Sequence, residues 1–313
     1  MDGRLEIFLV AFVGNFFRVH APNAATLRRL ALVPLWLGIA FCAQASESIA
    51  TWKVVIPAKP GSVGWYCENS FDLVWQVSLN DGVVEAKGLT LEELYSVEFN
   101  SPAATPQFSF GKLRDFPRRF VEVDDGFLVG YNKGEWGGKL YWFSRDTKSH
   151  YRISDHQVTG FVRHGTDVFA FEGLSHMMPG HGSMIKLEKR RGKWTARTIV
   201  NLGGEPGPYV AEGPERVLLL AESKWLLSLD FAGSKRLLHT SASGFGRASS
   251  IVRAPDGSIF VGAGRVVMRL TPDGGSFHEQ WLVRPKDAEA CKCRAVGVPP
   301  DREKKPWEPV VCD

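Results

Sequence analysis

The segment Gly173–Gly182 holds the residues best suited to binding a metal ion, because His176 and His181 flank Met177 and Met178. Imidazole and thioether groups together suit copper. Two histidines five residues apart on a loop have no fixed geometry, however, and methionines there commonly pack against neighbouring strands. We therefore name His176 and His181 as candidate copper ligands, with loop packing as the interpretation that we favour.

A second segment, Asn132–Gly138, places Glu135 and Trp136 among glycines. The Glu135 carboxylate could hold a cation, and the Trp136 indole offers an apolar face on which a sugar-like ligand could stack. A tryptophan between glycines more often covers the end of a sheet, which is the interpretation that we favour. Asp155 and His156 could act as an acid and base pair, although an aspartate at a strand junction is commonly a turn former.

The sequence contains no serine-nucleophile elbow, HExxH motif, phosphate-binding loop or paired metal motif, and it predicts no catalytic residue. Its net charge of +4 is small for 313 residues, and the basic side chains are interspersed with acidic ones. Nothing in this pattern indicates binding to nucleic acid.

The elements that must position these loops are short β-strands. The stretch Phe245–Val283 divides into four strands joined by tight turns, among them the turn Pro255-Asp256-Gly257. One sheet of this kind leaves both faces uncovered, so it predicts neighbours of the same kind, as in a β-propeller.

The same four-strand pattern recurs upstream, in Phe120–Ser154, Val158–Asn201 and Tyr209–His239. The glycines of the central turns recur about 40 to 50 residues apart, which is near one blade per repeat. We predict an all-β propeller of four-stranded antiparallel blades, five in number, with six as the competing count. A β-sandwich or a β-helix is the alternative fold.

Ahead of these copies, Leu73–Leu79 and Val83–Lys87 predict the outer hairpin of a first blade. Its inner strands would come from Thr51–Ile56 or from the tail of the chain. The sequence Leu89–Ser96 is predicted to form a short helix in the gap before the next blade.

The start of the chain has the layout of a secretory signal peptide. Arg28 and Arg29 precede the apolar run Leu30–Ala43, and small residues follow up to Ala45. We expect cleavage near Ala45 and a periplasmic or secreted protein without a membrane span; an uncleaved anchor or a lipid on Cys42 are the alternatives. The predicted organisation is therefore 1–45 as extension and signal, 46–285 as propeller and 286–313 as a proline-containing strap.

Export also decides how the cysteines are interpreted. After cleavage an even number remains, namely Cys67, Cys291, Cys293 and Cys312, and thiols outside the cytosol usually oxidise. Cys291 and Cys293 point to opposite sides of an extended chain. One of them is expected to pair with Cys67 and fasten the two ends of the propeller; a metal site of the three tail cysteines is the alternative.

The lines GFLVGYNKGEWGGKLYWFS at Gly126–Ser144 and VFAFEGLSHMMPGHGSMIKL at Val168–Leu187 resemble a group of uncharacterised exported bacterial propeller-like proteins. They are also similar to lactonase-type propellers, which hold calcium in the channel through Glu, Asn and Asp side chains. That resemblance implies Glu135, Asn132 and Glu172 as the nearest candidate ligands.

Two functions follow from the sequence. The first is a monomeric, non-enzymatic binding module that holds a protein or a cell-envelope ligand on a face of the propeller. The alternative is a metal-dependent, lactonase-like hydrolase that uses a channel cation with Glu135 or Glu172 as ligand.

Overall fold

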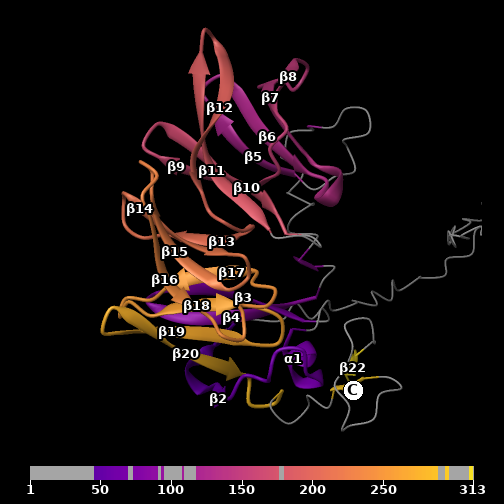
Figure 1. Cartoon of the computed structure of the whole chain (residues 1–313), viewed down its shortest axis with the longest axis vertical. Helices are drawn as coiled ribbons and strands as arrows, with labels where there is room; N and C mark the ends of the chain where they lie inside the picture. The colour runs from indigo at the N-terminus through magenta and orange to yellow at the C-terminus, as the bar shows by residue number, and fades with distance from the viewer. Residues whose placement is uncertain are drawn as a thin grey trace, which may run out of the picture. The chain divides into compact units, whose positions relative to one another are not determined.

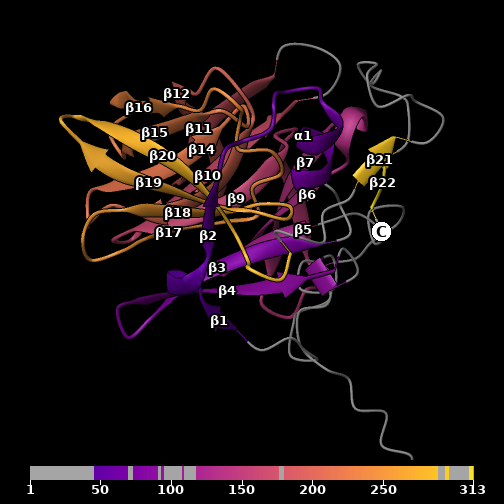
Figure 2. The ribbon, with the colours of Figure 1, turned by 90° about the horizontal axis from the view of Figure 1, so that it is seen from below.

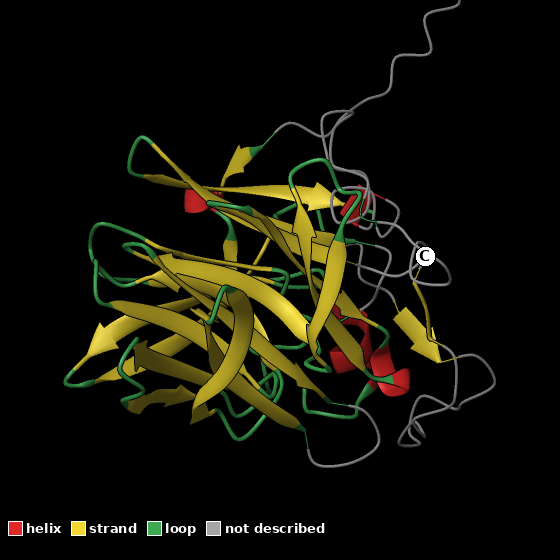
Figure 3. Ribbon diagram, turned by 90° about the horizontal axis from the view of Figure 1, so that it is seen from above, coloured by secondary structure: helices red, strands yellow, loops and turns green. Residues whose placement is uncertain are grey.

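The computed structural model describes residues 46–69, 73–90, 93–94, 108, 118–175, 180–287, 293–295 and 310–312. The predicted signal segment and His176 lie outside the described residues. Within them the chain is built almost wholly of antiparallel strands (Figure 3). No helix in the described part of the chain is long and apolar enough to cross a membrane.

Four sheets are consecutive four-stranded meanders, which confirms the predicted repeat. Their strands are β5 (Arg118–Val123), β6 (Gly126–Asn132), β7 (Gly138–Ser144) and β8 (His150–Ser154); β9 (Val158–His164), β10 (Asp167–Leu174), β11 (His181–Arg190) and β12 (Lys193–Asn201); β13 (Pro206–Ala211), β14 (Arg216–Ala221), β15 (Trp225–Asp230) and β16 (Lys235–Thr240); and β17 (Ser250–Arg253), β18 (Ile259–Gly262), β19 (Val267–Asp273) and β20 (Ser276–Val283).

A fifth sheet contains β3 (Val74–Asn80), β4 (Val83–Leu89) and the short β1 (Glu47–Ser48), in the order β1-β4-β3. Successive sheets are neighbours, since β5 contacts β9, β13 contacts β17 and β17 contacts β3 (Figure 1). The first strand of each meander, together with β3, borders one central cavity. The fold is therefore a propeller, and the described sheets match the predicted count of five blades.

Burial along the strands explains why the blades need one another. All but the first residue of β14 are buried, whereas β16 at the outer edge has no buried residue. A central strand covered on both faces reads as a continuous apolar run, because each face packs on a neighbouring sheet. The hydrophobic clusters accordingly lie between adjacent sheets.

Glycines allow the inner strands to approach closely. A Cβ added at Gly130 would stand 2.4 Å from the Val158 side chain, and one at Gly262 would stand 2.1 Å from the carbonyl oxygen of Trp75. Both contacts join one blade to the next. Because such distances leave no room for a side chain, glycine at these two positions sets the spacing of the blades.

The role predicted for the first hairpin is wrong. Strand β3 is an inner strand, because the Ser249 hydroxyl donates to the Trp75 carbonyl at 2.8 Å and the Val77 amide donates to Ser250 Oγ at 2.8 Å. The segment expected to supply inner strands instead forms β2 (Lys53–Val55), which pairs with β20 as the outermost strand of the last blade.

The N-terminal residues thus connect the first sheet to the last. Strand β1 lies beside β4 (Figure 2), and the short helix η1 (Ile49–Thr51) leads from it to β2. Ile49 and Trp52 are buried in one cluster with Trp75 and Phe260, which belong to these two sheets. An outer strand contributed by the start of the chain fastens the two blades non-covalently.

The structure also bears on two smaller predictions, the short helix after Leu89 and the position of Cys67. A helical turn at Glu93–Leu94 begins as predicted, because Thr90 Oγ1 accepts the Glu93 amide while the Glu93 carboxylate accepts the Thr90 amide at 2.8 Å, a capping box. Cys67 is buried in helix α1 (Val63–Glu68), which contacts β21 (Cys293–Ala295) and β22 (Val310–Cys312).

Candidate functional site

The central cavity has a volume of about 920 Å³ and lies where the inner strands of five blades converge. That volume is in the range of small-molecule sites. Its wall mixes apolar groups with side chains that can hydrogen-bond or carry charge. The polar ones are Arg119, Asn132, Thr159, Glu205, Tyr209, Arg247, Ser249 and Ser250.

The predicted loop Asn132–Gly138 stands at the edge of this cavity, since Asn132 and Gly134 line it. The buried side chain of Gln157 holds the loop by donating to the Gly134 carbonyl at 2.6 Å and to Asn132 Oδ1 at 3.3 Å. Asn132 Oδ1 also accepts the Gly134 amide at 2.8 Å. The Asn132 side chain therefore shapes the loop from within.

Glu135 and Trp136 occupy the 3-10 helix η3 (Gly134–Trp136) in this loop. Both are exposed, and the Trp136 side chain is 74% exposed. A tryptophan that covered the end of a sheet would be buried, so the interpretation that we favoured from the sequence is wrong. An exposed indole beside a cavity gives a ligand a flat apolar surface.

The described ends of the second predicted loop, Ser175 and His181, lie near Glu205, the cavity-wall residue before β13. Burial raises the pKa of the Glu205 carboxyl and the nearby Glu222 carboxylate raises it further, while the Ser175 amide and His181 oppose the rise. His181 thus lies close enough to act on Glu205, and its own side chain is exposed.

Glu222 has a strained backbone. Glu222 and Ser223 both have a φ of 50°, in the β14–β15 turn, and the Lys224 amide donates to the Ala221 carbonyl at 3.2 Å. Such a turn prefers glycine or asparagine. Its geometry brings the Glu222 carboxylate to the Glu205 amide at 3.2 Å, and the carboxylate packs so closely on Gly204 that a side chain there would collide with it.

Tyr209 of β13 crosses to the neighbouring blade. Its ring lies against Gly160, where a Cβ would be 2.7 Å from the ring, and its hydroxyl donates to the Phe161 carbonyl at 2.5 Å. Burial raises the pKa of the Tyr209 phenol, and the positive charge of Arg119 opposes that rise. Arg119 belongs to β5, which contacts the strand β9 where the Tyr209 hydroxyl is bonded.

The remaining predicted site residues do not form one centre. Glu172 is buried within the β9–β12 sheet, where its carboxylate accepts the Ser183 hydroxyl, so it does not line the cavity. Asp155 pairs with Lys139 and Arg152, and His156 Nδ1 bonds the Ser154 hydroxyl at 2.7 Å. The structure therefore shows no acid and base pair between Asp155 and His156.

No three or more His, Cys, Asp or Glu side chains stand together as a metal-binding group among the residues that the structure describes. Of the three calcium ligands suggested by resemblance, only Asn132 borders the cavity. His176, Met177 and Met178 of the copper prediction lie outside the described residues, so that prediction stays one.

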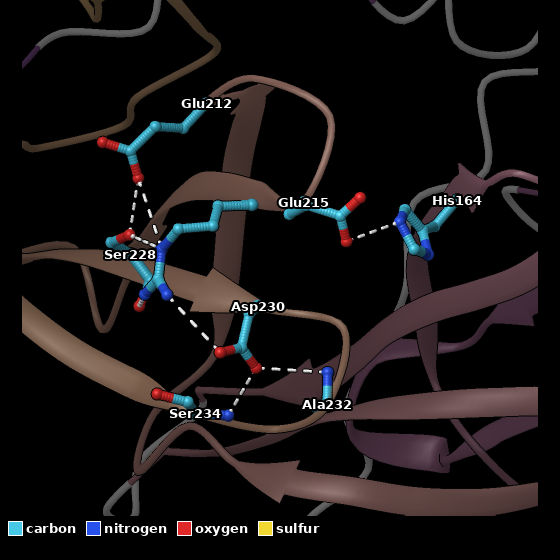
Figure 4. A network of polar contacts seen from close by, with 8 residues as sticks. His164, Glu212, Glu215, Ser228, Asp230, Ala232 and Ser234 are labelled. Atoms are coloured by element: carbon cyan, nitrogen blue, oxygen red, sulfur yellow. Dashed lines mark hydrogen bonds and ion pairs between the residues drawn. The ribbon is translucent and has the colours of Figure 1, made fainter.

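A second polar cluster, shown in Figure 4, lies in the β13–β16 sheet and serves the fold. Arg216 Nε donates to Ser228 Oγ at 2.8 Å, and its guanidinium lies 3.4 Å from Asp230. Asp230 in turn accepts the Ser234 amide at 2.7 Å, which lowers the pKa of its carboxyl. These groups satisfy one another, and none lines the central cavity.

Sequence reasoning missed four of the residues that give the cavity its chemistry: Arg119, Glu205, Tyr209 and Arg247. It searched the loops between second and third strands, where unusual residues stand out. The available signal was position, because the first strand of every blade, with the residues just before it, faces the centre of a propeller.

The comparisons with known proteins define no family for this chain. No family model matches it. A stretch of 87 residues is 31% identical to ribonuclease Z of Pyrococcus abyssi, but this covers 27% of the chain and 28% of that protein. The chain thus spans less than a third of the length of this curated relative.

Two solved structures are similar at low identity. A catalytically inactive variant of virginiamycin B lyase from Staphylococcus aureus, with quinupristin, is 9% identical over 68% of this chain and 86% of that one, with a TM-score of 0.30. A Bacteroides uniformis protein assigned as a 6-phosphogluconolactonase is 11% identical over 77% and 78%, with a TM-score of 0.29.

Proposed function

We propose that this chain is an exported, non-enzymatic propeller that binds a protein segment or a cell-envelope ligand in its central cavity. The observation that carries the proposal is the cavity itself, because five inner strands leave about 920 Å³ open and direct polar side chains toward it. A propeller core built only for stability would fill that space with side chains.

The exposed loop of Glu135 and Trp136 supports a role in binding. The indole of Trp136 is 74% exposed, and an amphipathic ring of this kind can stack on a ligand with its flat apolar face. Gln157 fixes the loop against the cavity wall, so a bound ligand would meet a surface that is already formed.

The direct test is to block the cavity. Thr159→Phe puts a ring on the inner strand β9, and we expect the variant to lose the envelope component that the purified wild-type chain retains through washing, as identified by mass spectrometry. Gly207→Phe, at an exposed cavity position where a Cβ has 3.5 Å of clearance, is the second variant. The outer-strand variant Leu237→Phe is the control.

Equilibrium unfolding must show all three variants to be folded. If both folded cavity variants keep the component as well as wild type does, the cavity is not the binding site and the proposal fails.

Export and a disulfide of Cys67 belong to the same proposal. They are supported by the signal-like residues before Ala45 and by the packing of α1 against the two short strands that contain Cys293 and Cys312. Cell fractionation and N-terminal sequencing are expected to find a chain that begins at Ser46. A mature chain that still begins at Met1 in the cytosol would contradict export.

The Cys67 link is tested by stability under oxidising conditions. We expect Cys67→Ser to lower the free energy of unfolding by about 2–5 kcal/mol, measured with denaturant, and to leave the stability of the reduced protein much less changed. Equal losses in the oxidised and reduced states would mean that the substitution only perturbs packing of this buried side chain.

A further inference from the structure

We infer that the central cavity selects ligands that carry a carboxylate or phosphate group, through Arg119 and Arg247. This inference rests on the proposed function, since it names the chemical class of ligand for the same cavity. It begins with the charged side chains that the described part of the chain contributes to the wall, namely Arg119, Arg247 and Glu205.

The arginines come from different blades. Arg119 is in β5, while Arg247 precedes β17, so the two guanidinium groups are supplied from two sides of one space. A guanidinium offers a planar fork of N–H donors that matches carboxylate and phosphate oxygens, and it keeps its charge at any physiological pH. Two of them around one cavity favour an anionic group.

The charge of Arg119 acts on another residue of the cavity wall. Burial raises the pKa of the Tyr209 phenol, and the positive charge of Arg119 opposes that rise. The Tyr209 hydroxyl donates to the Phe161 carbonyl of β9, a strand that contacts β5, so the affected group lies on the neighbouring blade. A positive charge that favours a phenolate in this wall also favours an anionic ligand placed beside it.

Glu205, the acidic side chain that the described residues contribute to the wall, does not oppose this preference. Burial and the neighbouring Glu222 both raise the pKa of Glu205, which means that its ionised form is disfavoured where it stands. Thr159 and Ser249 line the same wall, and because their hydroxyls donate to the Phe171 and Trp75 carbonyls, they can accept hydrogen bonds from a ligand. The arrangement thus suits a polar ligand with one anionic end and hydroxyl groups along its length.

The experiment uses matched probes that differ only in charge. Galacturonate is compared with galactose, and glucose 6-phosphate with glucose, by isothermal titration of the full-length protein as it is purified from cells. We expect the anionic member of at least one pair to bind about tenfold or more tightly than its neutral partner, a difference of about 1.4 kcal/mol. The two pairs tell a carboxylate site from a phosphate site.

Substitutions then test which side chains bind the anion. Arg119→Gln and Arg247→Gln should each weaken binding of the preferred anion about tenfold or more and leave binding of the neutral sugar unchanged. Arg253→Gln is the matched control, because Arg253 ends the same strand β17 but lies outside the cavity wall. Added salt should weaken binding to wild type and have less effect on either cavity variant.

The inference is overturned if no anionic probe binds, if neutral and anionic sugars bind equally, or if Arg253→Gln weakens binding as much as the cavity variants. The proposed function is judged separately by the cavity-blocking variants. Suppose that Thr159→Phe no longer retains the envelope component whereas Arg119→Gln retains it as wild type does. The binding role of the cavity would then stand, and its selectivity for anions would be rejected.

Discussion

The interfaces between blades and the central cavity are built from the same inner strands, yet they use polar groups in opposite ways. Between blades, polar groups meet protein partners, as when the Ser249 hydroxyl donates to the Trp75 carbonyl or the Tyr209 hydroxyl to that of Phe161. Arg119, Glu205 and Arg247 line the cavity in addition to their contacts within the protein.

The difference shows which polar residues serve the fold. An unsatisfied buried group costs more free energy than a formed hydrogen bond contributes, which favours interfaces whose polar groups are paired within the protein. Side chains that border the cavity can use part of their capacity on water and exchange that water for a ligand. Stability should therefore be sensitive to the interfaces, and binding to the cavity wall.

Between these two regions, the largest expected effect is at an interface where there is no space for a side chain. Gly262→Ala would place a methyl group 2.1 Å from the Trp75 carbonyl oxygen, and we expect it to lower the free energy of unfolding by about 1–3 kcal/mol. Denaturant titration measures this. Gly207→Ala, with 3.5 Å of clearance at the cavity, is the control, and an equal loss there would erase the contrast between the two regions.

A smaller effect is expected when one interface hydrogen bond is removed. Tyr209→Phe leaves the Phe161 carbonyl without the phenol that donates to it, and we expect a loss of about 1 kcal/mol in unfolding free energy. Arg119→Gln, on the cavity wall, should change stability by less than about 0.5 kcal/mol. The comparison fails if the arginine variant proves the less stable of the two.

The third prediction concerns pH. Because the pKa of Glu205 is raised above its ordinary value of 4.5, the folded protein holds this proton more tightly than the unfolded chain. The resulting stability is complete below pH 4.5 and is lost as pH rises through the folded pKa. Glu205→Gln removes that loss, so its thermal midpoint should exceed that of wild type by more at pH 8 than at pH 4.

A control isolates this effect. Glu122 pairs with Arg145 on the surface, where its side chain is 57% exposed, and exposed pairs contribute little to stability. Glu122→Gln should therefore show almost the same midpoint difference at both pH values. A Glu205→Gln difference that does not grow between pH 4 and pH 8 would show that the cavity leaves this carboxyl in an ordinary environment.

The smallest predicted effect is local. Gln157→Leu removes the donor to the Gly134 carbonyl, so hydrogen exchange of the amides in the Glu135–Trp136 loop should become faster while global stability changes little. Gln280→Leu in β20, whose amide pairs with Arg269, is the matched control and should leave the loop unaffected. Unchanged exchange in Gln157→Leu would mean that the loop is held by other contacts.

Much of the fold could be predicted because its signals are local. Turn glycines such as Gly257 and alternating apolar residues mark strands and turns from neighbours in the sequence, and Thr90 with Glu93 marks a helix start within four residues. The four complete blades were therefore predicted nearly residue by residue. The loop that begins at Asn132 and borders the cavity could also be found from the sequence, because it departs from the short turns of the repeat.

Only the tertiary structure decided which strand lies inside and which residues meet at the centre. Both strands of the first hairpin alternate in the same way, so the pattern could not show that β3 is an inner strand or that Lys53–Val55 joins a blade formed some 230 residues later. Arg119, Glu205 and Arg247 come from three blades. Their proximity is produced by the packing of sheets around a common axis, a non-local effect that no single stretch of the chain encodes.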